Sequence, residues 1–362
     1  MNLERLYNQI IDPNRKVIHE PFFRVLNAVS FFHSALMRLR SRGYSAGWLS
    51  SKKLDCRVVS IGNLTLGGTG KTPMTLWLAR MLRSRGHRPA ILSRGYKGTT
   101  QGSTNVVCDG QNVLLSPESA GDEPVMLASR LKDVPVLVGA NRYSSALFAS
   151  QHFDSDVLLL DDGYQHLALR RDCNILLLDC ANPFGNGLVF PSGHLREPIE
   201  AIERADVICF TRCSEEGSFS TGDFPLKLSK PSVKTRPRLS AWVRLDTGER
   251  LPPEGLCGES VLAFCGIARP EDFQRLLDKA GVRTVSKFDF SDHHFYSKKD
   301  LNLMQRGLGK ARCIATTEKD AVKIRLFSWD VPIFYAEIDL DVFEGEEFLI
   351  RSVLGSEEKV NL

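Results

Sequence analysis

The chain has 362 residues, of which 43% are hydrophobic and 25% are charged, so it is long enough for two domains with ordinary cores. This composition excludes disordered, collagen-like and disulfide-scaffold chains. The net charge is only +4, but residues 1–57 carry ten Lys or Arg against four Asp or Glu. Because the basic excess is confined to one end, we do not expect a general nucleic-acid-binding protein.

The nine cysteines are scattered, with no C-x-x-C pair and no Cys/His spacing typical of a metal site. An odd count without a regular framework predicts reduced thiols in a cytoplasmic protein. The N-terminus lacks the charged and apolar regions of a signal peptide. No run of 18 apolar residues occurs, so we expect no helix that crosses a bilayer.

Residues 21–40 (PFFRVLNAVSFFHSALMRLR) predict an unusually apolar helix. Its polar residues recur every three or four positions from Arg24 to Arg38, which makes one narrow polar stripe. Basic residues at its end and just beyond it, such as Arg40 and Arg42, suit contact with anionic headgroups. Two interpretations stay open from the pattern alone: an in-plane membrane helix, or a helix packed on the protein's own core.

A phosphate-binding loop is predicted where an apolar strand at 56–61 is followed by a glycine-rich loop and a helix at 74–82. Glycines let backbone N–H groups turn toward phosphate oxygens, and the helix N-terminus adds partial positive charge. The nucleotide-binding residues predicted here are Thr65, Leu66, Gly67, Gly68, Thr69, Gly70, Lys71 and Thr72. Lys71 suits the β- and γ-phosphates, and the Thr72 hydroxyl suits Mg²⁺. Thr65 stands where the general P-loop pattern has glycine.

An acidic partner for this loop follows another apolar strand, at residues 156–160, which ends in Asp161 and Asp162. This is the arrangement by which P-loop enzymes hold Mg²⁺. Further continuous apolar runs lie at 90–92, 134–138, 174–178 and 207–210. Such runs predict strands buried on both faces. We therefore expect an α/β fold with a mostly parallel P-loop sheet flanked by helices, and ligands at the carboxyl ends of its strands.

Phosphoryl transfer to a hydroxyl also needs a group that accepts the proton. Asp122 opens a predicted helix, where it is either an N-cap or a functional carboxylate. Arg142 is either a γ-phosphate contact or a surface arginine. Asp292 and His293 lie in a polar loop at 291–296 that is either a proton-handling site or a surface turn.

The rhythm of strands and helices lapses between residues 211 and 260 and then returns. We therefore predict a membrane-associated helical segment at 1–50, a P-loop kinase core at 51–215, a linker or hinge at 216–259 and a smaller α/β domain at 260–362. A cleft that closes on ATP is expected between the kinase core and the smaller α/β domain.

Nine ordered motifs along nearly the whole chain resemble the tetraacyldisaccharide 4′-kinases of lipid A synthesis. They are SIGNLTLGGTGKTP (60–73), LSRGYKG (92–98), GDEPVMLA (121–128), GANR (139–142), LDDGYQH (160–166), PSGHLREP (191–198), FCGIARPEDF (264–273), DHHFY (292–296) and TTEKDAVK (316–323). Thr65 in place of the loop glycine is itself a feature of that family's loop. The resemblance implies transfer of the ATP γ-phosphate to the 4′-hydroxyl of tetraacyldisaccharide 1-phosphate, yielding lipid IVA, with ATP and Mg²⁺.

The resemblance also implies residue roles. Asp122 matches the family's proposed catalytic carboxylate, and His293, oriented by Asp292, matches the histidine paired with it. Arg142 matches a residue near the phosphates. The metal-side residues implied are Thr72, Asp161, Asp162 and, more weakly, Glu197. The residues implied for substrate binding are Tyr96, Gln165 and His166.

A lipid with four acyl chains stays in the bilayer, so the resemblance favours the membrane interpretation of residues 21–40. It implies a peripheral or monotopic enzyme on the cytoplasmic face of the bacterial inner membrane, with no nucleic-acid partner and no obligate protein partner. Two alternatives remain. One is a membrane-associated P-loop ATPase switch, although Leu66 stands where such proteins have a signature lysine. The other is a kinase of a soluble small molecule, which leaves the apolar helix unexplained.

Overall fold

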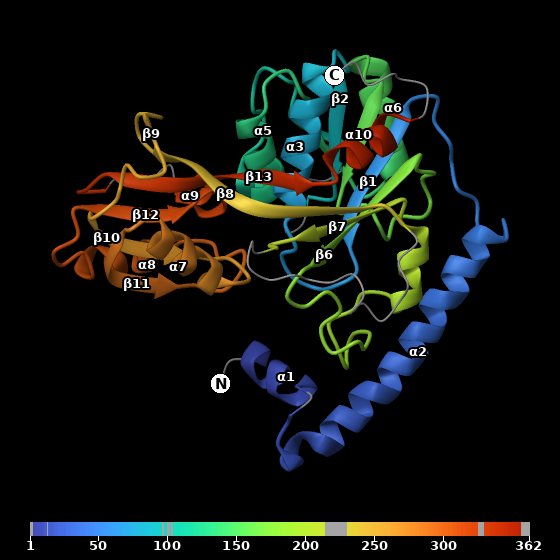
Figure 1. Cartoon of the computed structure of the whole chain (residues 1–362), viewed down its shortest axis with the longest axis horizontal. Helices are drawn as coiled ribbons and strands as arrows, with labels where there is room; N and C mark the ends of the chain where they lie inside the picture. The colour runs from blue at the N-terminus through green and yellow to red at the C-terminus, as the bar shows by residue number, and fades with distance from the viewer. Residues whose placement is uncertain are drawn as a thin grey trace. The chain divides into compact units, whose positions relative to one another are not determined.

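The computed structural model describes residues 3–12, 14–95, 98–99, 102, 104–213, 230–324 and 329–355. The chain divides into two units, each assembled from separate segments (Figure 1). The first unit comprises Met1–Lys71, Ser155–Arg236 and Val342–Leu362. The second unit comprises Thr72–Asp154 and Pro237–Asp341. Each is described by itself below.

The first unit is built on a parallel sheet in the order β8-β7-β6-β1-β5. Its strands are β1 (Arg57–Asn63), β5 (Val157–Asp161), β6 (Cys173–Asp179), β7 (Val207–Thr211) and the first residues of β8 (Ser232–Arg244). β5 and β7 are buried along their whole length, as expected of apolar strands covered on both faces. Phe210 and Tyr164 are among the largest fully buried side chains in this core.

Short helices and one long helix complete the first unit. They are α1 (Leu3–Ile11), η1 (Val17–His19), α2 (Glu20–Ser45), η2 (Ile199–Arg204) and α10 (Glu346–Leu354). Figure 1 shows α2 as the long blue helix. Among the described residues, no helix combines the length and the hydropathy that a bilayer crossing requires.

Helix α2 turns the middle and the C-terminal part of its polar stripe toward the rest of its own unit, whereas Arg24 is exposed. Ser30 is buried and donates a hydrogen bond to the Val189 carbonyl at 2.6 Å, and Arg38 pairs with Glu200 at 3.0 Å. Seven apolar side chains of α2 are instead exposed, each by 50% to 72%. These are Phe22, Val25, Val29, Phe31, Phe32, Leu36 and Leu39. The apolar face of α2 therefore does not serve as the contact with the unit's core.

The second unit contains two groups of strands. In the first group, β4 (Val136–Val138) pairs in parallel with β2 (Pro89–Ser93) and antiparallel with β3 (Asn105–Cys108). In the second group, parallel strands run in the order β11-β10-β12-β13. Their bounds are β10 (Ser260–Cys265), β11 (Arg283–Asp289), β12 (Cys313–Thr317) and β13 (Ile333–Glu344). The short strand β9 (Arg250–Leu251) pairs antiparallel with the end of β8.

Seven helices accompany these strands among the described residues. They are α3 (Lys71–Ser84), α4 (Pro117–Ala120), α5 (Asp122–Arg130), α6 (Arg142–His152), α7 (Pro270–Lys279), α8 (Lys298–Arg306) and α9 (Glu318–Ile324). Helix α3 begins at Lys71, the last residue of the first unit's N-terminal segment. The chain is therefore an α/β protein whose strands are mostly parallel, as the sequence predicts.

Two expectations need correction. The N-cap of α5 is Gly121, which has φ +94°, so Asp122 is the first residue of the helix and not its cap. The cysteines are not all reduced, because Cys180 and Cys213 form a disulfide. Their thiols come together only because each follows a neighbouring strand, which sequence spacing does not reveal.

The sequence predicts consecutive domains, whereas the two units draw on interleaved segments. Within the predicted linker at 216–259, residues 232–244 form β8 and residues 250–251 form β9. Residues 214–229 lie outside the described residues. The four-part division, with its hinge at 216–259, stays a prediction.

Candidate functional site

The glycine-rich loop leaves β1 in the conformation that a phosphate-binding loop requires. Gly67 and Gly70 have φ of +98° and +82°, a region that side chains other than glycine rarely adopt. Thr69 is 3% exposed, and its hydroxyl has no hydrogen-bond partner among the described residues. Since a buried hydroxyl is costly without a partner, this orphaned group fits a loop that awaits a ligand oxygen.

Backbone contacts within the first unit fix the start of this loop. The Leu66 N–H donates to the His194 carbonyl at 2.7 Å, and the Arg196 N–H donates to the Leu64 carbonyl at 2.6 Å. The Asn63 side chain donates to the Thr65 carbonyl at 2.7 Å. Thr65 is thus held by a buried amide, and the flexibility that glycine usually supplies at this position is not needed.

Lys71 ends the loop among oxygen atoms of its own unit. Its Nζ lies 3.3 Å from Asn63 Oδ1 and 3.6 Å from Asp162 Oδ1. Arg196 bonds both oxygens of the same Asp162 carboxylate at 2.9 Å. Burial raises the pKa of Asp162, but Lys71 and Arg196 outweigh it and lower the pKa below its usual range. Asp162 is therefore an anion that positions Lys71, and its φ of +53° is the kind of backbone strain common at functional sites.

Asp161 lies beside the loop because β1 and β5 are parallel neighbours. Ile61 pairs in register with Asp161, so the loop and this carboxylate emerge at the same sheet edge. Asp161 is 2% exposed. Its carboxylate and the Thr72 hydroxyl are hard oxygen donors, the chemistry that Mg²⁺ prefers when phosphates and water supply the other ligands. The described residues contain no group of three or more His, Cys, Asp or Glu side chains that could alone hold a metal ion. The carboxylate of Asp161 thus fits Mg²⁺ that arrives with a nucleotide.

A salt bridge that the sequence did not reveal supports the loop from the next strands. Arg212 follows β7 and pairs with Asp179, at the end of β6, at 2.6 Å. Arg212 also donates to the Gly68 carbonyl of the loop. Because the Gly68 carbonyl accepts this hydrogen bond from Arg212, the N–H groups of the loop are available to a ligand.

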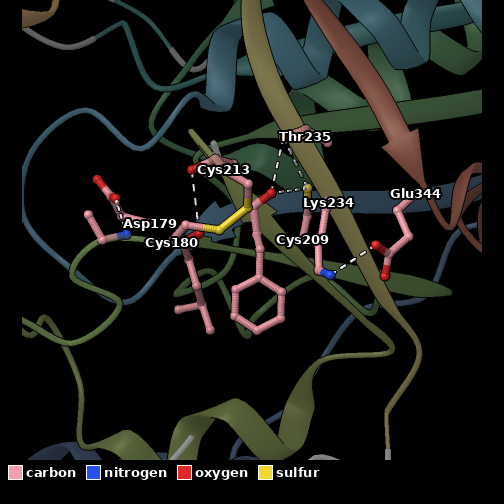
Figure 2. Close-up of a disulfide and its surroundings, with 11 residues drawn as sticks. Asp179, Cys180, Cys209, Cys213, Lys234, Thr235 and Glu344 are labelled. Atoms are coloured by element: carbon pink, nitrogen blue, oxygen red, sulfur yellow. Dashed lines mark hydrogen bonds and ion pairs between the residues drawn. A yellow bond between two sulfur atoms is a disulfide. The ribbon is translucent and has the colours of Figure 1, made fainter. Parts of the chain in front are cut away.

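The Cys180–Cys213 disulfide joins the residues that directly follow Asp179 and Arg212. Figure 2 shows the bridge beside Asp179, with Cys213 reaching the strand that carries Thr235. The Cys213 N–H donates to the Thr235 carbonyl at 3.1 Å, and the Cys180 N–H donates to the Thr211 carbonyl at 2.9 Å. The bridge therefore cross-links the two segments that carry the Asp179–Arg212 pair.

The residues predicted to bind substrate differ in their contacts. Gln165 donates to the Asn63 carbonyl at 2.9 Å, so it contacts the residue that precedes the loop. The His166 carbonyl accepts from Arg171 at 2.9 Å. Tyr96 lies outside the described residues. The buried Glu197 pairs with Arg204 at 2.8 Å, so its carboxylate already has a counterion, and the metal role expected for it stays a prediction.

The second unit brings Asp122 and His293 together from positions 171 residues apart. His293 Nδ1 lies 3.0 Å from both carboxylate oxygens of Asp122. Asp122 is 7% exposed at the start of α5, and His293 lies in the loop after β11 with φ +58°. The pair that the resemblance implied is therefore present in the structure as a direct contact.

Lys319, from α9, completes this cluster, which sequence reasoning missed. Its Nζ lies 3.2 Å from His293 Nε2, 3.2 Å from Asp292 Oδ1 and 3.3 Å from Glu123 Oε1. An ammonium can only donate, so His293 Nε2 accepts and Nδ1 carries the proton donated to Asp122. A neutral His293 with this tautomer satisfies both contacts.

The charge balance keeps Asp122 ionised. Burial raises its pKa, but the hydrogen bond from His293 and the charges of Lys319 and Lys323 outweigh burial and lower it. Lys323 Nζ lies 3.7 Å from Asp122 Oδ2. Burial lowers the pKa of Lys319, but Glu123, Asp122 and Asp292 outweigh it and raise the pKa. Asp122 is thus an anion held in a nearly dry site, a suitable proton acceptor when a hydroxyl approaches.

Asp292 orients His293 indirectly. Its Oδ1 accepts from the His293 backbone N–H at 3.0 Å, whereas its Oδ2 lies 3.7 Å from the ring Nε2, beyond hydrogen-bond distance. Its second route to the ring is through Lys319. Arg142 is buried at the start of α6 and donates to the Gly139 carbonyl. Its predicted phosphate contact stays a prediction.

Comparison with known proteins shows the family to which the chain belongs. The family model for tetraacyldisaccharide-1-phosphate 4′-kinase matches residues 22–355. The tetraacyldisaccharide 4′-kinase of Syntrophus aciditrophicus is 41% identical over 351 residues, which cover 93% of this chain and 94% of the relative. That of Geobacter sulfurreducens is 42% identical over 306 residues, 83% of this chain and 85% of the relative.

A solved structure agrees. LpxK from Aquifex aeolicus, crystallised in complex with ATP, superposes with a TM-score of 0.75 at 30% sequence identity. The match covers 92% of this chain and 100% of that chain. The chain therefore belongs to the tetraacyldisaccharide-1-phosphate 4′-kinase family of ATP-dependent kinases.

Proposed function

We propose that this protein transfers the γ-phosphate of ATP to the 4′-hydroxyl of tetraacyldisaccharide 1-phosphate, forming lipid IVA. The observation that carries this proposal is the parallel pairing of β1 with β5, which sets a phosphate-binding loop beside a buried carboxylate. Family membership supports the identity of the acceptor lipid.

The phosphate loop and Lys71 hold the triphosphate in this proposal. Loop N–H groups bond its oxygens, and Lys71 neutralises charge that develops as the β–γ bridging bond breaks. Asp161 would offer its carboxylate and Thr72 its hydroxyl to Mg²⁺, which would neutralise phosphate charge when it is bound. Asp162 keeps Lys71 in place through their 3.6 Å contact.

Asp122 accepts the proton of the attacking 4′-hydroxyl as the new P–O bond forms. His293 donates to the ionised carboxylate through Nδ1 and fixes its orientation. Lys319 favours this tautomer of His293 by donating to Nε2.

We further propose that α2 lies in the membrane interface on the cytoplasmic face of the inner membrane. Its polar stripe contacts the protein, as in the 2.6 Å bond from Ser30 to the Val189 carbonyl, while its apolar side chains are exposed. Exposed basic residues such as Arg24 and Arg42 suit anionic headgroups.

Binding to lipid vesicles tests this orientation of α2. The double variant Phe31→Asn/Phe32→Asn should lose vesicle binding. The matched control Leu303→Asn/Phe348→Asn removes two side chains of similar exposure from α8 and α10 and should bind as the wild type does. Equal losses in both variants would contradict an assignment of α2 to the interface.

Phosphate transfer tests the proposed reaction. Purified protein is mixed with Mg-ATP and detergent-dispersed tetraacyldisaccharide 1-phosphate, and the lipid is followed by mass spectrometry. We expect the mass of one added phosphate. ATP hydrolysis in the presence of membranes, without modified lipid, would favour the ATPase switch instead.

A further inference from the structure

A cavity of about 610 Å³ lies within the first unit, between the second half of α2 and the segments around residues 167–174 and 197–204. Its lining is dominated by charge, with five arginines against three glutamates. The arginines are Arg38, Arg42, Arg170, Arg171 and Arg204. The proposed kinase chemistry uses none of them.

Two of these arginines have carboxylate partners among the described residues. Arg38 pairs with Glu200 at 3.0 Å, and Arg204 pairs with Glu197 at 2.8 Å. In the part of the chain that the structure describes, Arg42, Arg170 and Arg171 have no carboxylate within ion-pair distance. Arg171 donates instead to Asn174 Oδ1 and to the His166 carbonyl, both at 2.9 Å.

The cavity therefore holds uncompensated positive charge in partly buried surroundings. Burial and the neighbouring Arg204 lower the pKa of Arg171 to about 10, so the protonated guanidiniums repel one another. The Nε of Arg204 is buried and has no hydrogen-bond partner among the described residues. An anion in the cavity would relieve the repulsion and give these N–H groups an acceptor.

The geometry of the ligand follows from guanidinium chemistry and from position. A guanidinium group can donate two parallel hydrogen bonds to the oxygens of one phosphate. A phosphate-bearing headgroup also fills a cavity of this volume better than a single carboxylate does. The cavity shares α2 with exposed Leu36 and Leu39, so a ligand with acyl chains can place its phosphate inside while its chains follow the apolar side of the helix.

We propose that this cavity binds the phosphate of an anionic phospholipid headgroup and thereby fixes α2 on the membrane surface. The inference rests on the interfacial position proposed for α2 but not on the kinase reaction. It adds a defined lipid site to the diffuse attraction between basic residues and an anionic surface.

The test uses full-length protein and a short-chain phosphatidylglycerol below its critical micelle concentration, so that no membrane surface is present. Isothermal titration calorimetry measures binding to the wild type and to Arg42→Gln/Arg170→Gln. Both substituted side chains are exposed and lack an ion pair, so circular dichroism should be unchanged. We expect at least tenfold weaker binding in this variant.

The matched control is Lys16→Gln/Arg24→Gln, which removes two charges from the same N-terminal segment outside the cavity. It should retain wild-type affinity for the short-chain lipid. Equal weakening in both double variants would overturn the site, since it would reduce the effect to net charge. Inorganic phosphate is the second probe. Affinity for it equal to that for the lipid would overturn the assignment to a headgroup.

The acceptor lipid of the kinase reaction also carries a phosphate, and a phosphate-transfer assay distinguishes it from a phospholipid as the ligand of the cavity. In phospholipid-free detergent, Arg42→Gln/Arg170→Gln should leave the KM for the acceptor lipid unchanged. A KM raised tenfold there would assign the cavity to the acceptor's own phosphate and overturn the phospholipid proposal. If the wild type transfers no phosphate, the proposed reaction fails while lipid binding by calorimetry still decides this inference.

Discussion

The phosphate loop and the Asp122–His293 cluster are built in opposite ways. The loop is one continuous segment whose glycines, lysine and threonine act through local backbone geometry, with support from Asp162 and Arg212. The Asp122 cluster combines α5, the loop after β11 and α9, which are separated by up to 200 residues. We infer that the phosphate loop binds the nucleotide and that the Asp122 cluster accepts a proton. Mutation can test this division of roles.

The largest effect is expected for Lys71→Ala. Removing this ammonium deletes the main positive charge at the loop, so transfer should fall by about a thousandfold or more, with weaker ATP binding. Steady-state transfer and equilibrium binding of a fluorescent ATP analogue measure both effects. Lys132→Ala, an exposed lysine after α5, should behave as the wild type. Near-normal turnover of Lys71→Ala would contradict the loop's role.

Asp122→Asn should lower kcat by about a hundredfold to ten-thousandfold, the range that a general base contributes. The amide keeps the shape of the side chain but cannot accept the proton. Glu118→Gln, on the exposed surface of α4, is the control with the same chemical change. A kcat within twofold of the wild type would return Asp122 to a structural role at the start of α5.

Lys319→Met should lower kcat by about tenfold and shift its pH profile. Lys319 helps to lower the pKa of Asp122, so its loss raises that pKa. Asp122 is active when deprotonated, and the acidic limb of the kcat profile should therefore move to higher pH. Lys299→Met, which changes an exposed lysine of α8, should leave the limb in place. A shift to lower pH would contradict the arrangement of charges described above.

Arg212→Ala should raise the KM for ATP by a few-fold and change kcat little, because the residue positions the loop without entering the chemistry. Arg85→Ala, exposed after α3, is its control. A fall in kcat with an unchanged KM would contradict a role in nucleotide binding.

The disulfide beside Arg212 predicts a smaller, purely analytical result. Under denaturing, non-reducing conditions, thiol titration should find seven free cysteines of the nine. Reduction should raise the count to nine. Nine thiols before reduction would exclude the Cys180–Cys213 bridge.

How much of this could be predicted from the sequence depends on how local each feature is. The strand–loop–helix around Lys71 was predictable because glycine spacing and an apolar run dictate it within a few residues. The neighbouring position of Asp161 also followed, since parallel strands present their carboxyl ends at one sheet edge. Arg212 and the disulfide were not predictable, because each depends on which strands are neighbours.

The Asp122 cluster illustrates the same limit. Residue patterns left Asp122 and His293 as equal choices between structural and functional roles, and only the family resemblance paired them. Lys319 stood in a recognised motif but had no role, although its i, i+4 spacing from Lys323 on α9 signalled two cations on one helix face. The orientation of α2 could be learned only from the structure, because a narrow polar stripe does not indicate which side of the helix contacts the protein.

The most direct test of the divided roles is the dissociation constant for ATP of Asp122→Asn, measured on the preparation whose kcat is determined. We predict a dissociation constant within about twofold of the wild type while kcat falls at least a hundredfold. A dissociation constant that rises as much as kcat falls would mean that Asp122 serves nucleotide binding, and it would contradict the separation between the loop and the proton-handling cluster.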